Sequence, residues 1–244
     1  MTVVDFHSHI LPNIDHGCKS IDECAAQLAL MKSAGTQIAV ATPHFYPHVH
    51  KADTFSERVN ASVRLLRSSE IKNAPQLAIG AEVLLCENLD TMDGLSELCI
   101  RGTRVLLLEL PTEKLRDGHF DTVEMLLANG YTVVLAHIDR YIKNHGNDIQ
   151  ELLGMGALAQ VNAQALSSHK TSKKIKEYVR SNHVCALGSD LHGVDKALYR
   201  YFTKLPKRLG ADYGAIMDRA ARLLYDAVLV DTEYYDYLEG NFLS

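Results

Sequence analysis

The 244-residue sequence lacks an apolar run near the roughly 20 residues that a membrane-spanning helix requires. It opens in a strand-like segment rather than in a charged region followed by an apolar one, so we expect no secretory signal. Its five cysteines are an odd number without paired spacing, which is typical of a reduced intracellular protein. These absences predict a cytoplasmic protein.

Basic clusters are also missing. The 25 basic and 30 acidic residues give a formal net charge of −5, and no segment concentrates lysine or arginine, so no nucleic-acid-binding face is predicted. No linker, repeat or low-complexity segment divides the chain. We expect one domain over residues 1–244, with an acidic, tyrosine-rich exposed tail at 231–244.

Two common hydrolase signatures are absent. No cysteine is followed by an arginine six positions later, so the sequence lacks the Cys-x₅-Arg cradle of cysteine-based phosphatases. No Gly-x-Ser-x-Gly segment is present, which excludes a nucleophile elbow. Any hydrolytic chemistry is therefore expected to use another nucleophile.

The chain does contain a regular alternation of strand and helix patterns. Nearly continuous apolar runs are typical of strands covered on both faces, and they occur at Val3–Ile10, Gln37–His44, Gln76–Leu85, Arg104–Leu110, Tyr131–Ile138, Ala157–Ala163 and Val184–His192. Amphipathic segments predict helices at Ser20–Ala34, Thr54–Ile71, Asp117–Asn129, Asn147–Gly154 and Thr171–Asn182, with two more near Leu198–Leu209 and Tyr213–Val228. Ser20 and Asp117 are the expected N-caps, and Gly35 and Gly130 suit helix C-termini. This order predicts an α/β fold, a distorted or open β/α barrel of seven strands.

Almost every predicted strand ends in a side chain that can bind a metal ion. The candidate ligands, one of them in a loop, are His7, His9, His16, His44, Glu82, Glu109, His137, Asp190 and His192. Only the strand that ends at Asn162 lacks one. Because active sites of parallel β/α barrels form at the carboxyl ends of the strands, we expect these residues to converge.

Local spacing refines this list. His7 and His9 are two apart on a strand and share a face with Asp5, which could orient a ligand. In the loop after this strand, either Asp15 or His16 could bind metal, and we favour His16. Arg140, beside His137, would lie at the barrel mouth, where its planar fork could hold a phosphate.

A structural role is the alternative for the two glutamates. A buried carboxylate needs a partner, and Arg104 or Lys114 could supply a salt bridge to Glu82 or Glu109. A carboxylate that bridges two cations is the functional alternative, which we prefer. Nine candidate ligands are too many for one ion with about four to six ligands, so two or three ions are expected. A shell of nitrogen and oxygen donors suits Mn²⁺, Fe, Co²⁺ or Zn²⁺.

At these residues the chain resembles the PHP family, named for polymerase and histidinol phosphatase domains. Within that family it is most similar to the bacterial manganese-dependent protein-tyrosine phosphatases that regulate capsule and exopolysaccharide synthesis. The matching segments are D-F-H-S-H-I-L-P at 5–12, A-T-P-H at 41–44, G-A-E at 80–82, L-E-L-P at 108–111, A-H-I-D-R-Y at 136–141 and S-D-L-H at 189–192. Their order and spacing agree from Val3 to about Gly193.

The resemblance implies a distorted (β/α)₇ TIM-like barrel with three metal sites, Mn²⁺ being the expected ion. It would assign His7, His9, Glu82 and Asp190 to the first ion; Glu82, Glu109 and His137 to the second; and His16 (or Asp15), His44 and His192 to the third. Arg140 would match the phosphate-binding arginine of the family. A second arginine, usual after the last strand, is missing here, and only Lys196 is near its place.

The resulting hypothesis is metal-dependent hydrolysis of phosphomonoesters by a metal-activated hydroxide. The expected substrate is a phosphotyrosine protein, such as an autophosphorylating tyrosine kinase, and Asp15 could protonate the leaving group if it is not a ligand. The alternatives are a small-molecule phosphatase such as a histidinol-phosphate phosphatase, an amidohydrolase, a metal-dependent nuclease and a non-catalytic binding barrel. An amidohydrolase would usually place a bridging lysine where this chain has Glu109, and the missing basic surface argues against a nuclease.

Overall fold

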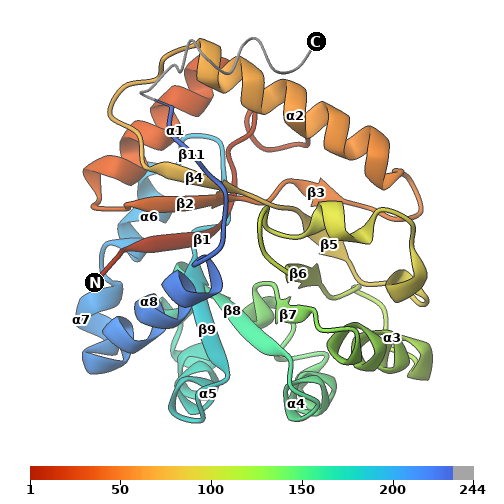
Figure 1. Ribbon diagram of the computed structural model, residues 1–244. Helices are drawn as coiled ribbons and strands as arrows, with labels where there is room; N and C mark the ends of the chain where they lie inside the picture. The colour runs from red at the N-terminus through yellow and green to blue at the C-terminus, as the bar shows by residue number, and fades with distance from the viewer. Residues whose placement is uncertain (233–244) are drawn as a thin grey trace.

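The computed structural model describes residues 1–232, except for the side chains of residues 169 and 170, and shows an α/β fold (Figure 1). The strands are β1 (Val4–His9), β2 (Ile38–Ala41), β3 (His44–Phe45), β4 (Gln76–Ile79), β5 (Glu82–Leu84), β6 (Val105–Glu109), β7 (Thr132–Leu135), β8 (Leu158–Asn162), β9 (Val184–Gly188), β10 (Leu191–His192) and β11 (Leu229–Val230). The α-helices are α1 (Ile21–Ser33), α2 (Ala52–Ser68), α3 (Asp117–Ala128), α4 (Gly146–Gly154), α5 (His169–Arg180), α6 (Lys196–Phe202), α7 (Leu205–Leu209) and α8 (Ala211–Leu223). The predicted α/β class is confirmed, whereas the predicted tail lies almost wholly outside the described residues.

The strands form two sheets, ordered β10-β1-β2-β4-β11 and β3-β5-β6-β7-β8-β9. Every pairing is parallel except that of β11 with β4. The pairs β2/β3, β4/β5 and β9/β10 each derive from one predicted strand, so seven strand positions succeed one another around the molecule. The backbone N–H of Asp190 donates to the carbonyl of His7 at 2.8 Å, which joins the last position to the first.

Three predicted strands are broken where their carboxyl ends turn toward the centre of the ring. Pro43 has no N–H to donate and separates β2 from β3. Gly80 separates β4 from β5, and a Cβ on it would lie 3.1 Å from the Ile100 side chain, a tight contact that would push Ile100 aside. Asp190, with φ of 54°, separates β9 from β10. The breaks explain why the strands do not close as one continuous sheet.

The first five predicted helices are present, with boundaries shifted by at most three residues. Ser20 is the N-cap of α1, and its side chain accepts a hydrogen bond from the Glu23 N–H. The prediction for Asp117 was wrong, because Arg116 occupies the N-cap position and Asp117 begins the helix. The Arg116 N–H donates instead to the His119 ring at 3.0 Å, so the third helical residue stabilises this start.

The region after β10 differs most from the prediction. The helix expected near Leu198–Leu209 is two helices, α6 and α7, because Pro206 cannot continue the first one. The helix expected to reach Val228 ends at Leu223, and the chain then forms β11 beside β4. Within residues 1–232, no helix is long and apolar enough to cross a membrane.

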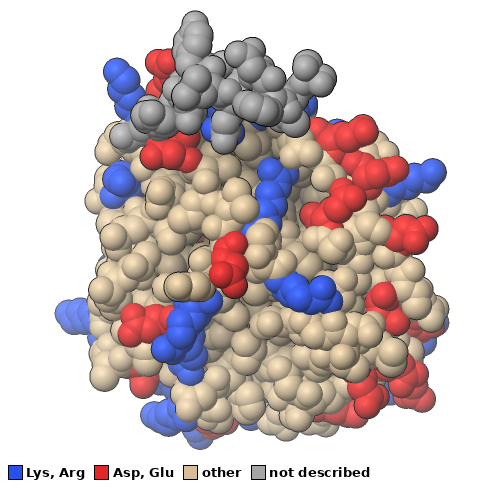
Figure 2. Space-filling model, viewed as in Figure 1, with Lys and Arg blue, Asp and Glu red and all other residues tan. Residues whose placement is uncertain are grey.

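Apolar side chains hold this frame together in two buried clusters. The larger cluster fills the space between the strands and the surrounding helices, with Leu28 of α1, Leu66 of α2 and Leu126 of α3 all fully buried. The smaller one joins Phe6 of β1 to α8 through Ala220. Charged side chains of both signs are interspersed on the face shown in Figure 2. The packed strands thus provide a rigid support for the side chains at their carboxyl ends.

Candidate metal centre

The histidines of β1 project into the centre of the ring. His7 and His9 are both fully buried, and their Nε2 atoms lie 3.1 Å apart. Asp5, on the same face by sequence spacing, does not contact either ring; its carboxylate accepts a hydrogen bond from the Ser189 N–H at 2.8 Å. Burial raises the pKa of Asp5 to about 6, although the hydrogen bonds from Ser189 oppose the shift. Asp5 therefore links β1 to Ser189, just after β9, and its expected role in orienting a ligand stays a prediction.

Glu82 is the shared contact of four imidazoles. Its Oε1 lies 2.5 Å from His137 Nε2, and its Oε2 lies 2.9 Å from His44 Nδ1. The Nε2 atoms of His7 and His9 are each 3.3 Å from Oε2. Burial would raise the pKa of Glu82, but the neighbouring imidazoles, His7 foremost, hold it well below its usual range.

Glu109, at the end of β6, closes one side of this group. Its carboxylate oxygens lie 3.8 Å from ring nitrogens of His44 and His137, and it accepts a hydrogen bond from the Tyr141 hydroxyl at 3.3 Å. Burial and the adjacent charge of Glu82 raise the pKa of Glu109. The two carboxylates are thus held close together, which is favourable when positive charge lies between them or when one of them is protonated.

The alternative salt bridges to arginine or lysine are not formed. Arg104 lies just before the start of β6, at the opposite end of that strand from Glu109. It donates to the backbone carbonyls of Asn129 and Gly130. Lys114 lines a separate cavity of about 420 Å³ together with Lys143. The partners of both glutamates in the described chain are imidazoles and a tyrosine.

Asp15 and His16, both in the loop after β1, make different contacts. Asp15 accepts hydrogen bonds from His9 Nδ1 at 2.6 Å, from the Gly17 N–H at 2.8 Å and from the His44 N–H at 3.0 Å. Burial opposes ionisation, but these donors, His9 foremost, keep the pKa of Asp15 well below its usual range. Asp15 therefore orients His9, and the exposed His16 is the loop residue that remains available to an ion.

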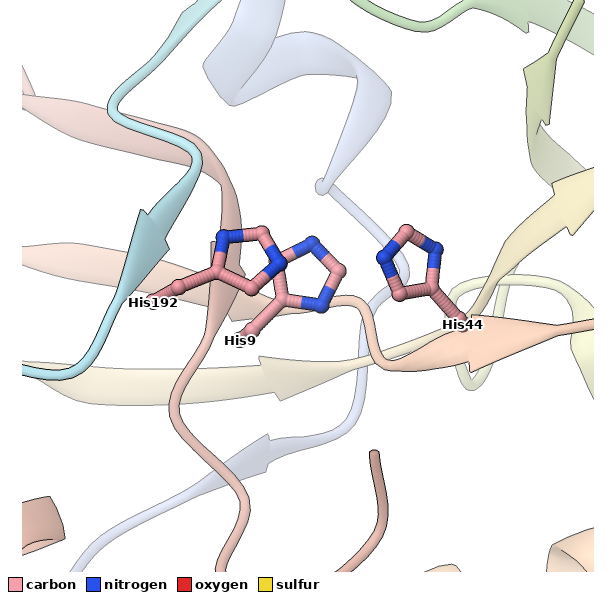
Figure 3. A group of neighbouring side chains, drawn as sticks. All are labelled: His9, His44 and His192. Carbon is pink, nitrogen blue, oxygen red and sulfur yellow. The ribbon is translucent and has the colours of Figure 1, made fainter. Parts of the chain in front are cut away.

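Three histidines from different strands meet at the mouth (Figure 3). His9 comes from β1, His44 from β3 and His192 from β10. The ring centroids of His9 and His192 are 3.9 Å apart, and those of His9 and His44 are 4.4 Å apart. The His16 ring stacks on His44 and His192 at 4.9 and 4.5 Å. Burial and the charge of His9 lower the pKa of His192 to about 4.

Asp190 completes the centre from the β9–β10 break. Its Oδ1 lies 3.4 Å from His9 Nε2 and 3.7 Å from His7 Nε2. Its other oxygen accepts a hydrogen bond from Arg140, whose side chain is 45% exposed and so reaches solvent at the mouth. Lys196, the basic residue near the place of the missing second arginine, lines a groove between α1 and α6 beside Leu30.

Six of these residues form three overlapping sets, and within each set the ligand atoms lie within 4.8 Å of one another. The sets are His7, His9 and Glu82; His44, Glu82 and Glu109; and His9, His44 and His192. Among the described residues, Glu82 Oε2, Asp190 Oδ1, His44 Nδ1, His137 Nδ1 and His192 Nε2 are buried and make no well-aligned hydrogen bond, although Glu82 Oε2 lies 2.9 Å from His44 Nδ1. Clustered buried polar atoms of this kind are suited to a ligand, and their nitrogen and oxygen donors suit divalent cations.

Several residues that contact the centre were not singled out from the sequence. Gln160 contacts His7 and His137, and Asn162 contacts Asp190. Tyr46 stacks on His44 with ring centroids 5.4 Å apart, and the Tyr141 ring lies tilted against His137 at 5.7 Å. Gln160 and Asn162 are two apart on a strand, which is the same spacing that identified His7 and His9, and this signal could have indicated them.

Comparison with known proteins is consistent with this geometry. The family described as "Capsular polysaccharide synthesis, CpsB/CapC" matches residues 3–222. The CapC protein of Staphylococcus aureus is 30% identical over 79% of this chain and 78% of its own. The tyrosine-protein phosphatase CpsB of Streptococcus pneumoniae is 24% identical over 93% of this chain and all of its own.

A solved structure has the same fold. It comes from work on YwqE of Bacillus subtilis and CpsB of Streptococcus pneumoniae, which are described as metal-dependent tyrosine phosphatases. It matches with a TM-score of 0.77 and 20% identity, covering 93% of this chain and 96% of that chain.

Proposed function

Because the chain belongs to the CpsB/CapC family of capsular polysaccharide synthesis, we propose that it is a metal-dependent protein-tyrosine phosphatase. The observation that carries the proposal is the cluster of buried imidazoles and carboxylates around Glu82. Five ligand atoms of that cluster, within the described chain, are buried close to one another but make no well-aligned hydrogen bond. A structural cluster would be expected to pair such atoms internally.

The side chains fit two or three divalent ions. We assign His7, His9, Glu82 and Asp190 to the first ion; Glu82, Glu109 and His137 to the second; and His16, His44 and His192 to the third. His9 lies close enough to His44 and His192 to contribute to the third site as well. The absence of thiolate and the mixed nitrogen and oxygen set favour Mn²⁺, with Fe, Co²⁺ and Zn²⁺ as alternatives.

In such a site, bound divalent ions supply a nucleophile near neutral pH by lowering the pKa of water, and they offset charge on the phosphoryl oxygens. Arg140 extends from the η3 turn (Ile138–Arg140) to the mouth, where its guanidinium can hold two of those oxygens. Its contact with Asp190 fixes the direction of the guanidinium. Arg140 thus binds and orients the phosphoryl group.

Asp15 is better suited to positioning than to proton donation. All its described contacts are with donors, from His9, Gly17 and His44, and they stabilise the ionised carboxylate. The departing group of phosphotyrosine is a phenolate with a pKa of about 10, which needs less protonation than an alkoxide. The reaction can therefore proceed without a strong general acid at this position.

We propose a phosphotyrosine protein as the substrate, and an autophosphorylating tyrosine kinase of the capsule system as the partner. The relatives named tyrosine-protein phosphatases and the capsule family support this choice. The five free cysteines are consistent with a reducing compartment, and we place the reaction in the cytoplasm.

The test is a phosphatase assay on metal-stripped protein. A phosphotyrosine peptide is the substrate, Mn²⁺, Zn²⁺ or Mg²⁺ is added back, and His7→Ala is the control. We expect metal-dependent turnover that the variant loses. If no metal restores turnover to a protein that binds more than one ion, tyrosine-phosphatase activity is refuted. Histidinol phosphate is assayed in parallel, and a strong preference for it would also overturn the proposed substrate.

A further inference from the structure

The strand β8 contributes no imidazole or carboxylate to the centre, in contrast to its neighbours in the described chain. Its carboxyl half instead carries Gln160 and Asn162, which are two apart and therefore share a face. Both side chains are fully buried. Burying two amides is costly unless they are hydrogen-bonded, so their contacts indicate why they are there.

The Gln160 amide links two candidate ligands from different strands. Its Oε1 lies 3.2 Å from His7 Nδ1 and 2.6 Å from the backbone N of His137. A backbone N–H can only donate, so the side-chain atom that faces it must be the oxygen. The His7 nitrogen that faces the same oxygen must then carry a hydrogen. In the neutral His7 ring, the lone pair is consequently on Nε2, the atom that faces Glu82 and Asp190.

Asn162 extends this arrangement to a third ligand. Gln160 Nε2 donates to Asn162 Oδ1 at 3.0 Å, and Asn162 Nδ2 donates to Asp190 Oδ2 at 3.0 Å. The second oxygen, Asp190 Oδ1, is thereby left to face His7 and His9. One chain of amides therefore fixes both the protonated nitrogen of His7 and the orientation of the Asp190 carboxylate.

The backbone around these amides is consistent with the same role. His137 and Asp190 have φ values of 28° and 54°, which side chains with a Cβ seldom adopt, and both residues are hydrogen-bonded by the β8 amides. Gly188 of β9 lies against this chain of amides. A Cβ there would lie 2.7 Å from Gln160 Nε2 and 2.7 Å from His7 Cβ, so glycine leaves the room that the contact needs.

We propose that Gln160 and Asn162 are positioning residues of the metal centre. Gln160 holds His7 as the Nδ1–H tautomer and directs its Nε2 lone pair at the ion, and Asn162 holds Asp190 with Oδ1 toward the ion. The inference deepens the proposed function and rests on its metal sites. It does not depend on the identity of the phosphorylated substrate.

The test measures Zn²⁺ binding and the His7 ring directly, without an activity assay. Zn²⁺ affinity is measured by competition with a chromogenic chelator in wild type, Gln160→Met and Asn162→Ala. Gln164→Met, at an exposed glutamine of the η4 turn (Ala163–Ser167), is the matched control. We expect about 10–100-fold weaker Zn²⁺ binding in Gln160→Met and Asn162→Ala, the range for loss of a group that orients a ligand, and no change in the control.

The tautomer is read from ¹H–¹⁵N NMR of the Zn²⁺-loaded protein with ¹⁵N-labelled histidine. We expect a slowly exchanging Nδ1–H signal from His7, assigned by its absence in His7→Asn. The signal should persist in Asn162→Ala and in Gln160→Glu, which keeps an acceptor, and disappear or exchange rapidly in Gln160→Met. A merely structural glutamine would not give this pattern.

Three results would overturn the inference. One is an Nε2–H tautomer of His7 in wild type, and another is unchanged Zn²⁺ affinity in folded Gln160→Met. If Gln160→Met does not fold, Gln160→Glu decides, and loss of its Nδ1–H signal would count against the proposal. If the variants change Zn²⁺ affinity and the His7 tautomer as expected but the wild-type protein has no phosphatase activity, the proposed function is refuted and this inference stands.

Discussion

The two ends of the strands in this molecule treat polar groups in opposite ways. At the carboxyl ends, within the described chain, Glu82 and Asp190 each bury a carboxylate oxygen that faces imidazole nitrogens without a well-aligned hydrogen bond. At the amino ends, Arg104 donates to two backbone carbonyls and its guanidinium lies 4.3 Å from the centre of the Tyr131 ring. Arg101 similarly donates to Asn60 at 2.7 Å.

The difference separates binding from stability. A buried polar atom without a partner costs about 1–3 kcal/mol, so the carboxyl ends are unfavourable until a ligand satisfies them. Arg104 and Arg101, at the amino ends, are already paired with groups of the protein itself and need no ligand. Changes at the carboxyl ends should therefore alter activity more than folding, and changes at the amino ends should do the reverse.

The largest effect is expected for Glu82→Gln. The amide keeps the shape but removes the charge that four imidazoles share, so kcat/KM on a phosphotyrosine peptide should fall about 10³-fold, or about 4 kcal/mol. The matched control is Glu124→Gln, an exposed glutamate of α3, which should keep wild-type activity. A loss of less than tenfold in Glu82→Gln would contradict a central role for this carboxylate.

Addition of metal should stabilise the wild-type protein. An ion that binds only the folded chain adds about 2.7 kcal/mol at 100 times its Kd, or about 5–10 °C in Tm for a domain of this size. Differential scanning calorimetry with and without Mn²⁺ measures the shift. Glu82→Gln should lose most of it, and an undiminished shift in that variant would mean that the ion binds elsewhere.

Arg104→Met tests the opposite end. It removes two hydrogen bonds to carbonyls and the contact with the Tyr131 ring, so Tm should fall with a loss of about 1–2 kcal/mol. Because Arg104 lies away from the metal centre, kcat/KM should stay within twofold of wild type. Arg64→Met on α2 serves as the control for loss of an exposed arginine. A large loss of activity in Arg104→Met without a change in Tm would break the comparison.

The smallest effect is expected for Ser20→Ala, near the carboxyl ends. Ser20 caps α1 through a 3.2 Å hydrogen bond from the Glu23 N–H, so its loss should cost about 0.5–1 kcal/mol in urea unfolding. Ser20→Asp, which keeps an acceptor, should restore most of that. If it does, stability depends on whether a polar group is paired and not on which end it occupies.

The strand and helix order was readable from sequence because burial on both faces leaves nearly continuous apolar runs. The breaks within strands could not be predicted. A polar residue at a break, such as Asp190, looks the same in sequence as a polar residue at the end of a strand. β11 escaped prediction for a different reason. Leu229–Val230 is too short to show a period, and its pairing with β4 depends on a residue separation of about 150 positions that local patterns do not record.

The candidate ligands could be predicted because ionisable side chains at the ends of apolar runs need a partner. The contacts of Asp15 could not, since they depend on how one loop folds back over His9 and His44. Gln160 and Asn162 were passed over because neutral amides are ordinary residues in sequence, and only their burial distinguishes them. That His7, His9 and their neighbours hold metal stays a prediction for the experiments above.

The short strand β11 also has a consequence for how copies of this protein behave at high concentration. β5 pairs with β6, but β4 does not, so without β11 the side of β4 away from β2 would be an open sheet edge at Leu77 and Ala78. β11 lies against that edge (Figure 1), with Leu229 opposite Ala78 and Val230 opposite Leu77. Uncovered edges of this kind invite pairing between molecules and the growth of aggregates. Two residues of antiparallel strand thus cover an edge that would otherwise be open to pairing with another molecule.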